Sequence, residues 1–179
     1  MEPCEECGFR PAAVSAAESP RLIRRLARRH GDWLTGMAAT QSGDAAIRVR
    51  PRKGAWSPLE YTGHVRDVYA LFDRRIQTVL KSPGSELEII DHDMAVAEGG
   101  YNRLAATALA DDLMLRADGL AATLRKVRPW QWSLRGFRGD ESRTIEEIAK
   151  RAVHEGRHHL MDVERITASR AKSVLRPSS

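Results

Sequence analysis

The sequence predicts an all-α fold, a four-helix bundle with some connections longer than a tight turn. Four long stretches carry apolar residues at helical spacing, and segments rich in Gly, Pro and Ser separate them. No long segment alternates apolar and polar residues as strands do. The 179 residues suit one domain, and we divide them into an arm with a Cys-x-x-Cys motif (1–17), the bundle (18–170) and a basic tail (171–179).

The first helix is expected from about Ser19 to Thr40. Ser19 is a suitable N-cap and Pro20 suits the first helical position. The apolar positions that follow recur at helical spacing and form one stripe: Leu22, Ile23, Leu26, Trp33, Leu34 and Met37. For residues 41–56 we expect a loop with a short extended piece.

The second helix has the clearest start in the sequence. Ser57, Pro58 and Glu60 supply a capping side chain, a proline at the first position and the acid of a capping box. We expect this helix to continue to Lys81. The acidic segment 86–99 then follows as a connector, to which its pattern assigns no structure.

The last third of the chain predicts two more helices with a short extended piece between them. The third helix covers roughly 102–127, and partial alternation over 130–137 indicates a short strand or hairpin. The fourth helix begins after a cap at Ser142 or Thr144 and continues to about Ser169. We expect the residues after it to form a frayed tail.

Composition and termini exclude several classes of protein. No apolar run approaches the roughly 20 residues that span a bilayer, and the acidic N-terminus has no apolar signal segment, so we expect a cytoplasmic protein. Two cysteines cannot form a disulfide scaffold. The net charge of +5 comes mostly from arginine, as in a GC-rich genome, and no nucleic-acid motif with interleaved aromatics accompanies it.

The histidines carry the strongest functional signal. His154 and His158 stand four residues apart, so they project from one face of the fourth helix and can share a metal ion. His64, on the inward stripe of the second helix, is the natural third ligand. Three imidazoles with one open position describe a catalytic metal site, whereas the alternatives are solvated histidines or a core histidine with satisfied hydrogen bonds.

The other histidines and nearby acids receive lesser roles. His159 is expected to point about 100° away from His158, and His30 is expected to be exposed. His92 lines a pocket mouth or is solvated, and we favour solvation. Acids one helical turn from the proposed ligands can orient them or line the pocket: Glu60, Asp67 and Asp162.

The arm carries a separate metal signal. Cys4 and Cys7 have the spacing of half a zinc or rubredoxin-type site, which needs histidines or a second subunit for completion. The alternatives are a redox-active pair or two reduced thiols on a flexible arm, and we favour the reduced thiols.

The stretch from Trp56 to Asp67, followed some ninety residues later by a helix with His154 and His158, resembles the DinB/YfiT-like superfamily. The resemblance covers roughly residues 18–170. It implies a four-helix bundle, a divalent ion (usually zinc or nickel) bound by His64, His154 and His158, and a dimer.

The same resemblance implies the first of three candidate functions, and the proposed metal centre leaves two others open. The first is transfer of a low-molecular-weight thiol of the mycothiol type to an electrophile, because a metal with an open position presents a thiolate nucleophile. The second is hydrolysis by metal-bound water. The third is a metal-binding stress-response module without turnover.

Overall fold

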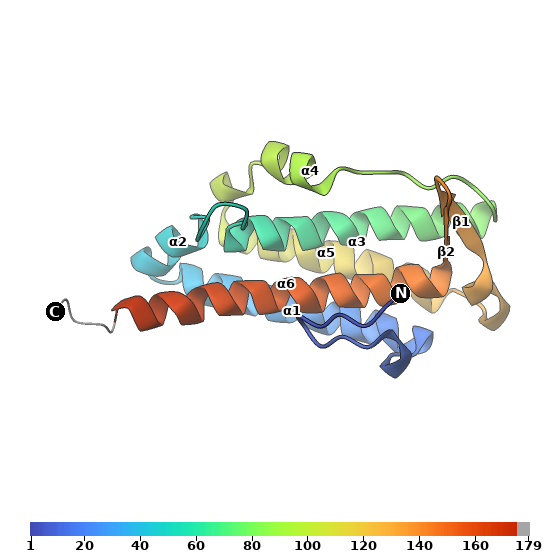
Figure 1. Cartoon of the computed structure of the whole chain (residues 1–179), viewed down its shortest axis with the longest axis horizontal. Helices are drawn as coiled ribbons and strands as arrows, with labels where there is room; N and C mark the ends of the chain where they lie inside the picture. Colours follow the sequence, from blue (N-terminus) through green and yellow to red (C-terminus); the bar gives the residue numbers. More distant parts are fainter. Residues whose placement is uncertain (175–179) are drawn as a thin grey trace.

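Four long helices make up the bundle of the computed structural model (Figure 1). The structure describes residues 1–174, with their side chains up to Ile166. The long helices are α1 (Ser19–Ala38), α3 (Pro58–Lys81), α5 (Ala106–Arg125) and α6 (Ile145–Val174). The shorter elements are α2 (Gln41–Ile47), α4 (His92–Gly99), the antiparallel strands β1 (Arg135–Arg138) and β2 (Glu141–Thr144), and 3₁₀ turns at Pro11–Ala13, Ala16–Glu18, Tyr101–Arg103 and Pro129–Ser133.

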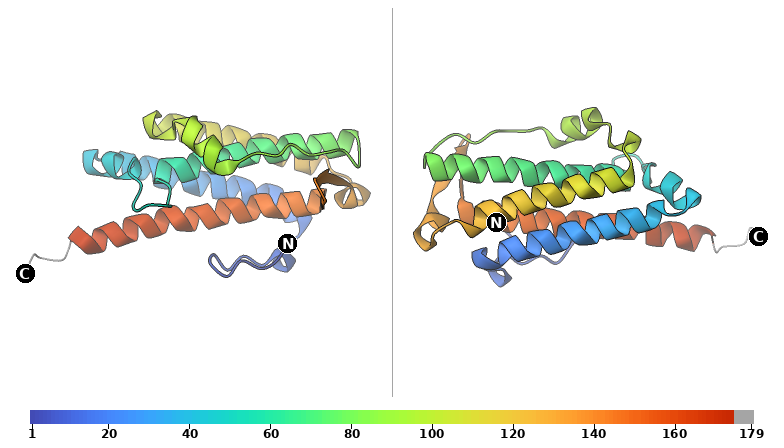
Figure 2. Two further views of the ribbon diagram at one scale, coloured as in Figure 1. Left: turned by 45° about the horizontal axis from the view of Figure 1, so that its top comes forward. Right: turned by 180° about the vertical axis from the view of Figure 1, so that it is seen from behind.

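Some connections between the long helices cross the bundle, as the sequence predicts. Helices α1 and α3 each pack mainly against α5 and α6, so consecutive long helices α1 and α3 lie diagonally. Seen from behind, α5 lies between α1 and α3 (Figure 2). The chain between α3 and α4 runs back along α3, so α3 and α5 run in the same direction (Figure 1).

Two capping boxes fix where the site-bearing helices begin. The Glu60 amide donates to the Ser57 hydroxyl at 3.2 Å, and the Ser57 amide donates to the Glu60 carboxylate at 2.8 Å. Thr144 and Glu147 make the equivalent pair before α6, at 3.1 and 2.8 Å. Thr144 is therefore the cap of α6, and the predicted start of α3 is confirmed.

Three connecting segments differ from the expectation. Residues 41–47 form α2, capped by the Thr40 hydroxyl, instead of a loop with an extended piece. Residues 92–99 form α4, capped by Asp91. The predicted extended piece at 130–137 is a strand only from Arg135, where β1 begins, and its hairpin partner β2 follows it; α6 extends beyond the predicted end to Val174. Both unexpected helices are too short to show helical periodicity in the sequence. Of the predicted tail, 175–179 lie outside the described residues.

Glycine at position 156 brings α6 close to the rest of the bundle. A Cβ at Gly156 would overlap the hydroxyl of Tyr69 on α3 and would crowd Leu26 on α1. Gly156 therefore permits the close contact of three helices in the middle of α6. Within residues 1–174, no helix is both long enough and apolar enough to cross a membrane.

His30 is buried at this contact, so the expectation that it is exposed is wrong. Its side chain is 0% exposed, and Nε2 lies 2.9 Å from the Gly156 carbonyl oxygen. The arginines around it in the sequence suggested a solvated face, but α5 and α6 both cover α1. Burial lowers the pKa of His30 to about 4, so the ring is neutral in the folded protein at pH 7.

His30 should make the fold acid-sensitive. The unfolded chain takes up a proton near pH 6.5 and the folded chain only near pH 4, so stability is lost as the pH falls through this window. Between pH 7 and pH 4 the free energy of unfolding should fall less in His30→Gln than in wild-type protein, and the difference should be about 3 kcal/mol. The Gln amide can still donate to the Gly156 carbonyl. Urea unfolding in a chelator at several pH values measures this. Parallel pH profiles would contradict it.

Candidate metal centre

One stretch of α6 carries two pairs of potential ligands in alternation. His154 and His158 form one pair, and Glu155 and His159 form another. Each pair spans one helical turn, and adjacent helix positions point about 100° apart. The two pairs therefore face different neighbours of α6.

The pair of Glu155 and His159 meets His64 of α3. The Nε2 atoms of His64 and His159 lie 3.5 and 3.4 Å from the same carboxylate oxygen of Glu155. All three offer ligand atoms within 4.8 Å of one another. Two imidazoles and a carboxylate at such separations suit a divalent ion such as zinc.

The structure divides the ligand set predicted from the sequence. Among the described residues, no such group unites His64 with His154 or His158, which instead lie with Cys4 and Cys7 of the arm. His159, expected to point away, has a ring centroid 4.9 Å from that of His64. The i,i+4 pattern pointed to the helix that faces His64, but the rotation of α6 about its axis turns Glu155 and His159 toward His64.

Asp162 orients His159 in the manner expected of an outer-shell acid. The Nδ1 atom of His159 lies 2.9 Å from Asp162, which leaves Nε2 directed toward Glu155 and His64. The ring of His159 also stacks on Tyr61, at 5.3 Å between centroids. A further grouping of His158, His159 and Asp162 shares these residues, and in it Asp162 is already engaged by His159.

The centre is a buried network of opposite charges. Burial alone would raise the pKa of Glu155, but hydrogen bonds from His154, His159 and His64 hold it well below its usual range. Burial opposes the charged form of His159 too, yet Asp162 and Glu155 raise its pKa to about 9. Metal binding at His159 must therefore displace a proton.

The other two predicted outer-shell acids are occupied elsewhere. Both carboxylate oxygens of Glu60 accept from Arg50 at 2.8 Å, and one also closes the α3 capping box. Asp67 accepts from the hydroxyl of Tyr101 and pairs with Arg66 at 3.0 Å. Only Asp162 touches a ligand of the group containing His64.

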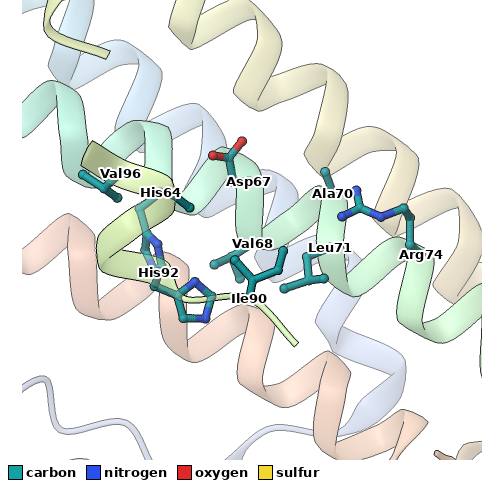
Figure 3. Close-up of a pocket in the computed structure, with 10 residues that line it drawn as sticks. His64, Asp67, Val68, Ala70, Leu71, Arg74, Ile90, His92 and Val96 are labelled. Atoms are coloured by element: carbon teal, nitrogen blue, oxygen red, sulfur yellow. The ribbon is translucent and has the colours of Figure 1, made fainter. Parts of the chain in front are cut away.

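A cavity of about 140 Å³ adjoins the centre on the far side of His64. Helix α3 supplies one wall, and α4 with the strand-like segment before it supplies the other (Figure 3). Most of the lining is aliphatic: Val68, Ala70, Leu71, Ile90, Ala95 and Val96, with His64, Asp67, Arg74 and His92 as the polar members.

His92 lies against His64 where both line this cavity, contrary to the favoured expectation that it is solvated. The two ring centroids are 4.9 Å apart and nearly perpendicular, and Figure 3 shows the rings side by side. Burial and the neighbouring His64 lower the pKa of His92. The sequence did not reveal this position because α4 itself was not predicted.

Comparison with known proteins identifies the family of the chain. A family model described as DinB superfamily matches residues 34–163. The chain belongs to the DinB superfamily. Among solved structures, it resembles that described as "YfiT from Bacillus subtilis is a probable metal-dependent hydrolase with an unusual four-helix bundle topology". The TM-score is 0.74 and the identity 15%, over 88% of this chain and 90% of the other. No curated protein matches the chain.

The fold of this DinB-superfamily chain is thus as predicted. Metal analysis of substituted protein tests which residues are its metal ligands. One signal for the observed group was present in the sequence, because Glu155 and His159 have the same i,i+4 spacing as the two histidines. A carboxylate is a common ligand beside histidine. An acid on a helix is usually solvated, however, so the pattern favoured the histidine pair.

Ligand substitutions should distinguish the two sets. In a Cys4→Ser/Cys7→Ser background, which lacks the arm thiols, His64→Ala, Glu155→Gln and His159→Ala should each weaken zinc binding by more than about 100-fold. That exceeds the effect of losing an outer-shell partner. His154→Ala should have little effect. Competition with a chromophoric chelator measures the affinities. Loss in His154→Ala with retention in His159→Ala would support the set predicted from the sequence.

Asp162 and Glu60 provide a matched test of outer-shell roles. Asp162→Asn should weaken zinc binding about 10- to 100-fold, because the amide oxygen is an uncharged and weaker acceptor for His159 and fixes its ring less well. Glu60→Gln should leave zinc affinity unchanged and lower the free energy of unfolding by about 1 kcal/mol, since it loosens the cap of α3 and the pair with Arg50. Equal zinc affinities for the two variants would contradict this assignment.

Proposed function

We propose that this protein is a metal-dependent hydrolase with its divalent ion held by His64, Glu155 and His159. The observation that carries the proposal is the convergence of two Nε2 atoms on one largely buried carboxylate, beside an aliphatic cavity. Two histidines and a glutamate are a ligand set of zinc hydrolases, in which water takes the fourth position. The similar Bacillus subtilis structure, described as a probable metal-dependent hydrolase, supports the same reaction class.

The bound ion would supply a nucleophile at neutral pH by lowering the pKa of its water. The chain itself provides the surroundings. Asp162 holds the ring of His159 in one orientation, and the aliphatic wall favours the apolar part of a small substrate over water. His92, on the opposite wall from His64, is the group available to accept a proton from the nucleophile.

Zinc is the ion we propose first and nickel second, since imidazole and carboxylate ligands suit both. The substrate is a small molecule, because the cavity holds only about 140 Å³. We propose further that the protein acts in the cytoplasm, as a homodimer, without nucleic-acid or membrane partners.

Thiol transfer is the second candidate, and the character of the cavity favours it. An aliphatic wall with one cation, Arg74, accommodates a thioether, an apolar electrophile and an anionic group of a cosubstrate thiol. A bound divalent ion would lower the pKa of that thiol as it does that of water. The two reactions differ only in the nucleophile, so assays can separate them.

Zinc-reconstituted protein should hydrolyse chromogenic esters or amides with short apolar acyl groups, and lose that activity on chelation. His64→Ala should abolish turnover, while Asp118→Asn, in an exposed ion pair between α1 and α5, should retain it. Parallel assays add mycothiol, bacillithiol or glutathione with monochlorobimane. Metal-dependent turnover only with a thiol would transfer the assignment to the second candidate. Silence in both assays would leave a binding module.

His92 should be required for turnover and dispensable for metal binding. His92→Ala should lower kcat/KM by about 100-fold or more, the range of a lost general base, with unchanged zinc affinity. Added imidazole should restore part of the rate if the ring transfers a proton. A variant with full activity, or one that loses zinc, would contradict this role.

A further inference from the structure

The N-terminal arm lies along α6 (Figure 1), on the face that carries His154 and His158. Its two cysteines and these two histidines offer four ligand atoms within 4.8 Å of one another. Sγ of Cys4 lies 3.5 Å from Nδ1 of His158. None of these four residues belongs to the group of His64, Glu155 and His159.

These separations match a tetrahedral ion. Zinc binds sulfur at about 2.3 Å and imidazole nitrogen at about 2.0–2.1 Å, so two such ligands at the tetrahedral angle lie about 3.6 Å apart. The spacing in the sequence agrees, because Cys-x-x-Cys and His-x-x-x-His are the ligand pairs of many closed zinc sites. The histidines missing from the half-site of the arm are thus supplied by the same chain.

We infer that Cys4, Cys7, His154 and His158 form a second metal site, a closed zinc clamp that fastens the arm to α6. Its four ligands complete a tetrahedral shell without an open position, so the site is structural and not catalytic. The chain would accordingly bind two zinc ions of different function, one on each face of the same turn of α6.

The backbone of the arm forms a turn that holds Cys4 and Cys7 near α6. The Cys4 amide donates to the Phe9 carbonyl at 2.9 Å, which closes the turn between the cysteines. Gly8 follows Cys7 with φ of +66°, a conformation that glycine adopts without strain. Phe9 is 1% exposed and its ring centroid lies 5.5 Å from that of His154. The turn of the arm therefore packs against His154, one of the two histidines with which its cysteines would bind a metal.

His154 has a polar atom that the protein leaves unsatisfied. Its Nε2 is buried and makes no hydrogen bond within the described part of the chain. A buried unpaired nitrogen is costly, and a metal ion in the cluster offers it a partner.

Second contacts around the cluster hold the ligands in place. Nε2 of His158, on the other side of the ring from Cys4, lies 3.7 Å from Asp162 and 3.6 Å from Glu6, as outer-shell carboxylates do at metal sites. Arg157 donates to the Cys7 carbonyl at 3.1 Å. These contacts join the arm and α6 even before a metal contributes.

Cobalt substitution tests the clamp and separates it from the proposed hydrolytic centre. Only a site with thiolate ligands gives a near-ultraviolet sulfur-to-cobalt charge-transfer band. Reduced wild-type protein should bind two cobalt ions and show this band. Cys4→Ser, Cys7→Ser and His158→Ala should each remove the band and one equivalent of metal. Glu5→Ser, an exposed residue in the same turn, should keep both.

The reciprocal variant keeps the two proposals distinguishable. His64→Ala should retain the band and lose the other equivalent, whether or not the protein proves to be a hydrolase. Zinc should slow trypsin cleavage at Arg10 in wild-type protein and in Glu5→Ser but not in Cys4→Ser. A single metal equivalent without the band, or thiols that react with a disulfide reagent equally fast with and without zinc, would overturn the clamp. So would ready formation of a Cys4–Cys7 disulfide in zinc-loaded protein.

Discussion

The buried carboxylate of Glu155 is the constraint on which the centre depends. A carboxylate removed from water is strongly destabilising unless several donors surround it. Glu155 obtains them from His64 on α3, from His159 one turn along α6 and from its neighbour His154. One anion therefore links α3 to α6, and it collects the imidazoles that a metal ion needs. A metal ion bound there would balance the charge of Glu155 in place of the protons on the surrounding histidines.

Each of the six positions from 154 to 159 has a structural use. His154 and His158 face the arm, and Glu155 and His159 face α3. Gly156, between them, permits the contact with Tyr69 and accepts from His30. Arg157 reaches the arm at the Cys7 carbonyl. Rotation of α6 by one residue would place side chains where only glycine fits, so the packing at Gly156 determines which ligand pair meets His64.

This dependence explains how far the sequence could predict the molecule. Helix starts are local, so capping residues such as Ser57 and Thr144 identified α3 and α6, and the spacing of the apolar stripes identified the bundle. The rotation of a helix is set by partners distant in sequence, and so the sequence suggested His154 and His158 as partners of His64 instead of Glu155 and His159. The expectation that His30 is exposed was wrong for the same reason, because the helices that bury it, α5 and α6, are distant in sequence. Helices α2 and α4, the latter carrying His92, were too short for a periodic signal.

The donors themselves indicate why one helix would carry two metal ions. Two thiolates neutralise a divalent ion, and a neutral complex with a full shell is a weak Lewis acid that stabilises the fold. One carboxylate and two imidazoles leave a positive charge and an open position, which polarise a bound substrate or nucleophile. Because Cys4 is tied to His158, and His158 adjoins His159, the clamp would immobilise the turn that supplies two of the three ligands of the reactive centre. Rigid ligands are a requirement for such a centre, since small displacements of ligands or substrate lower the rate steeply.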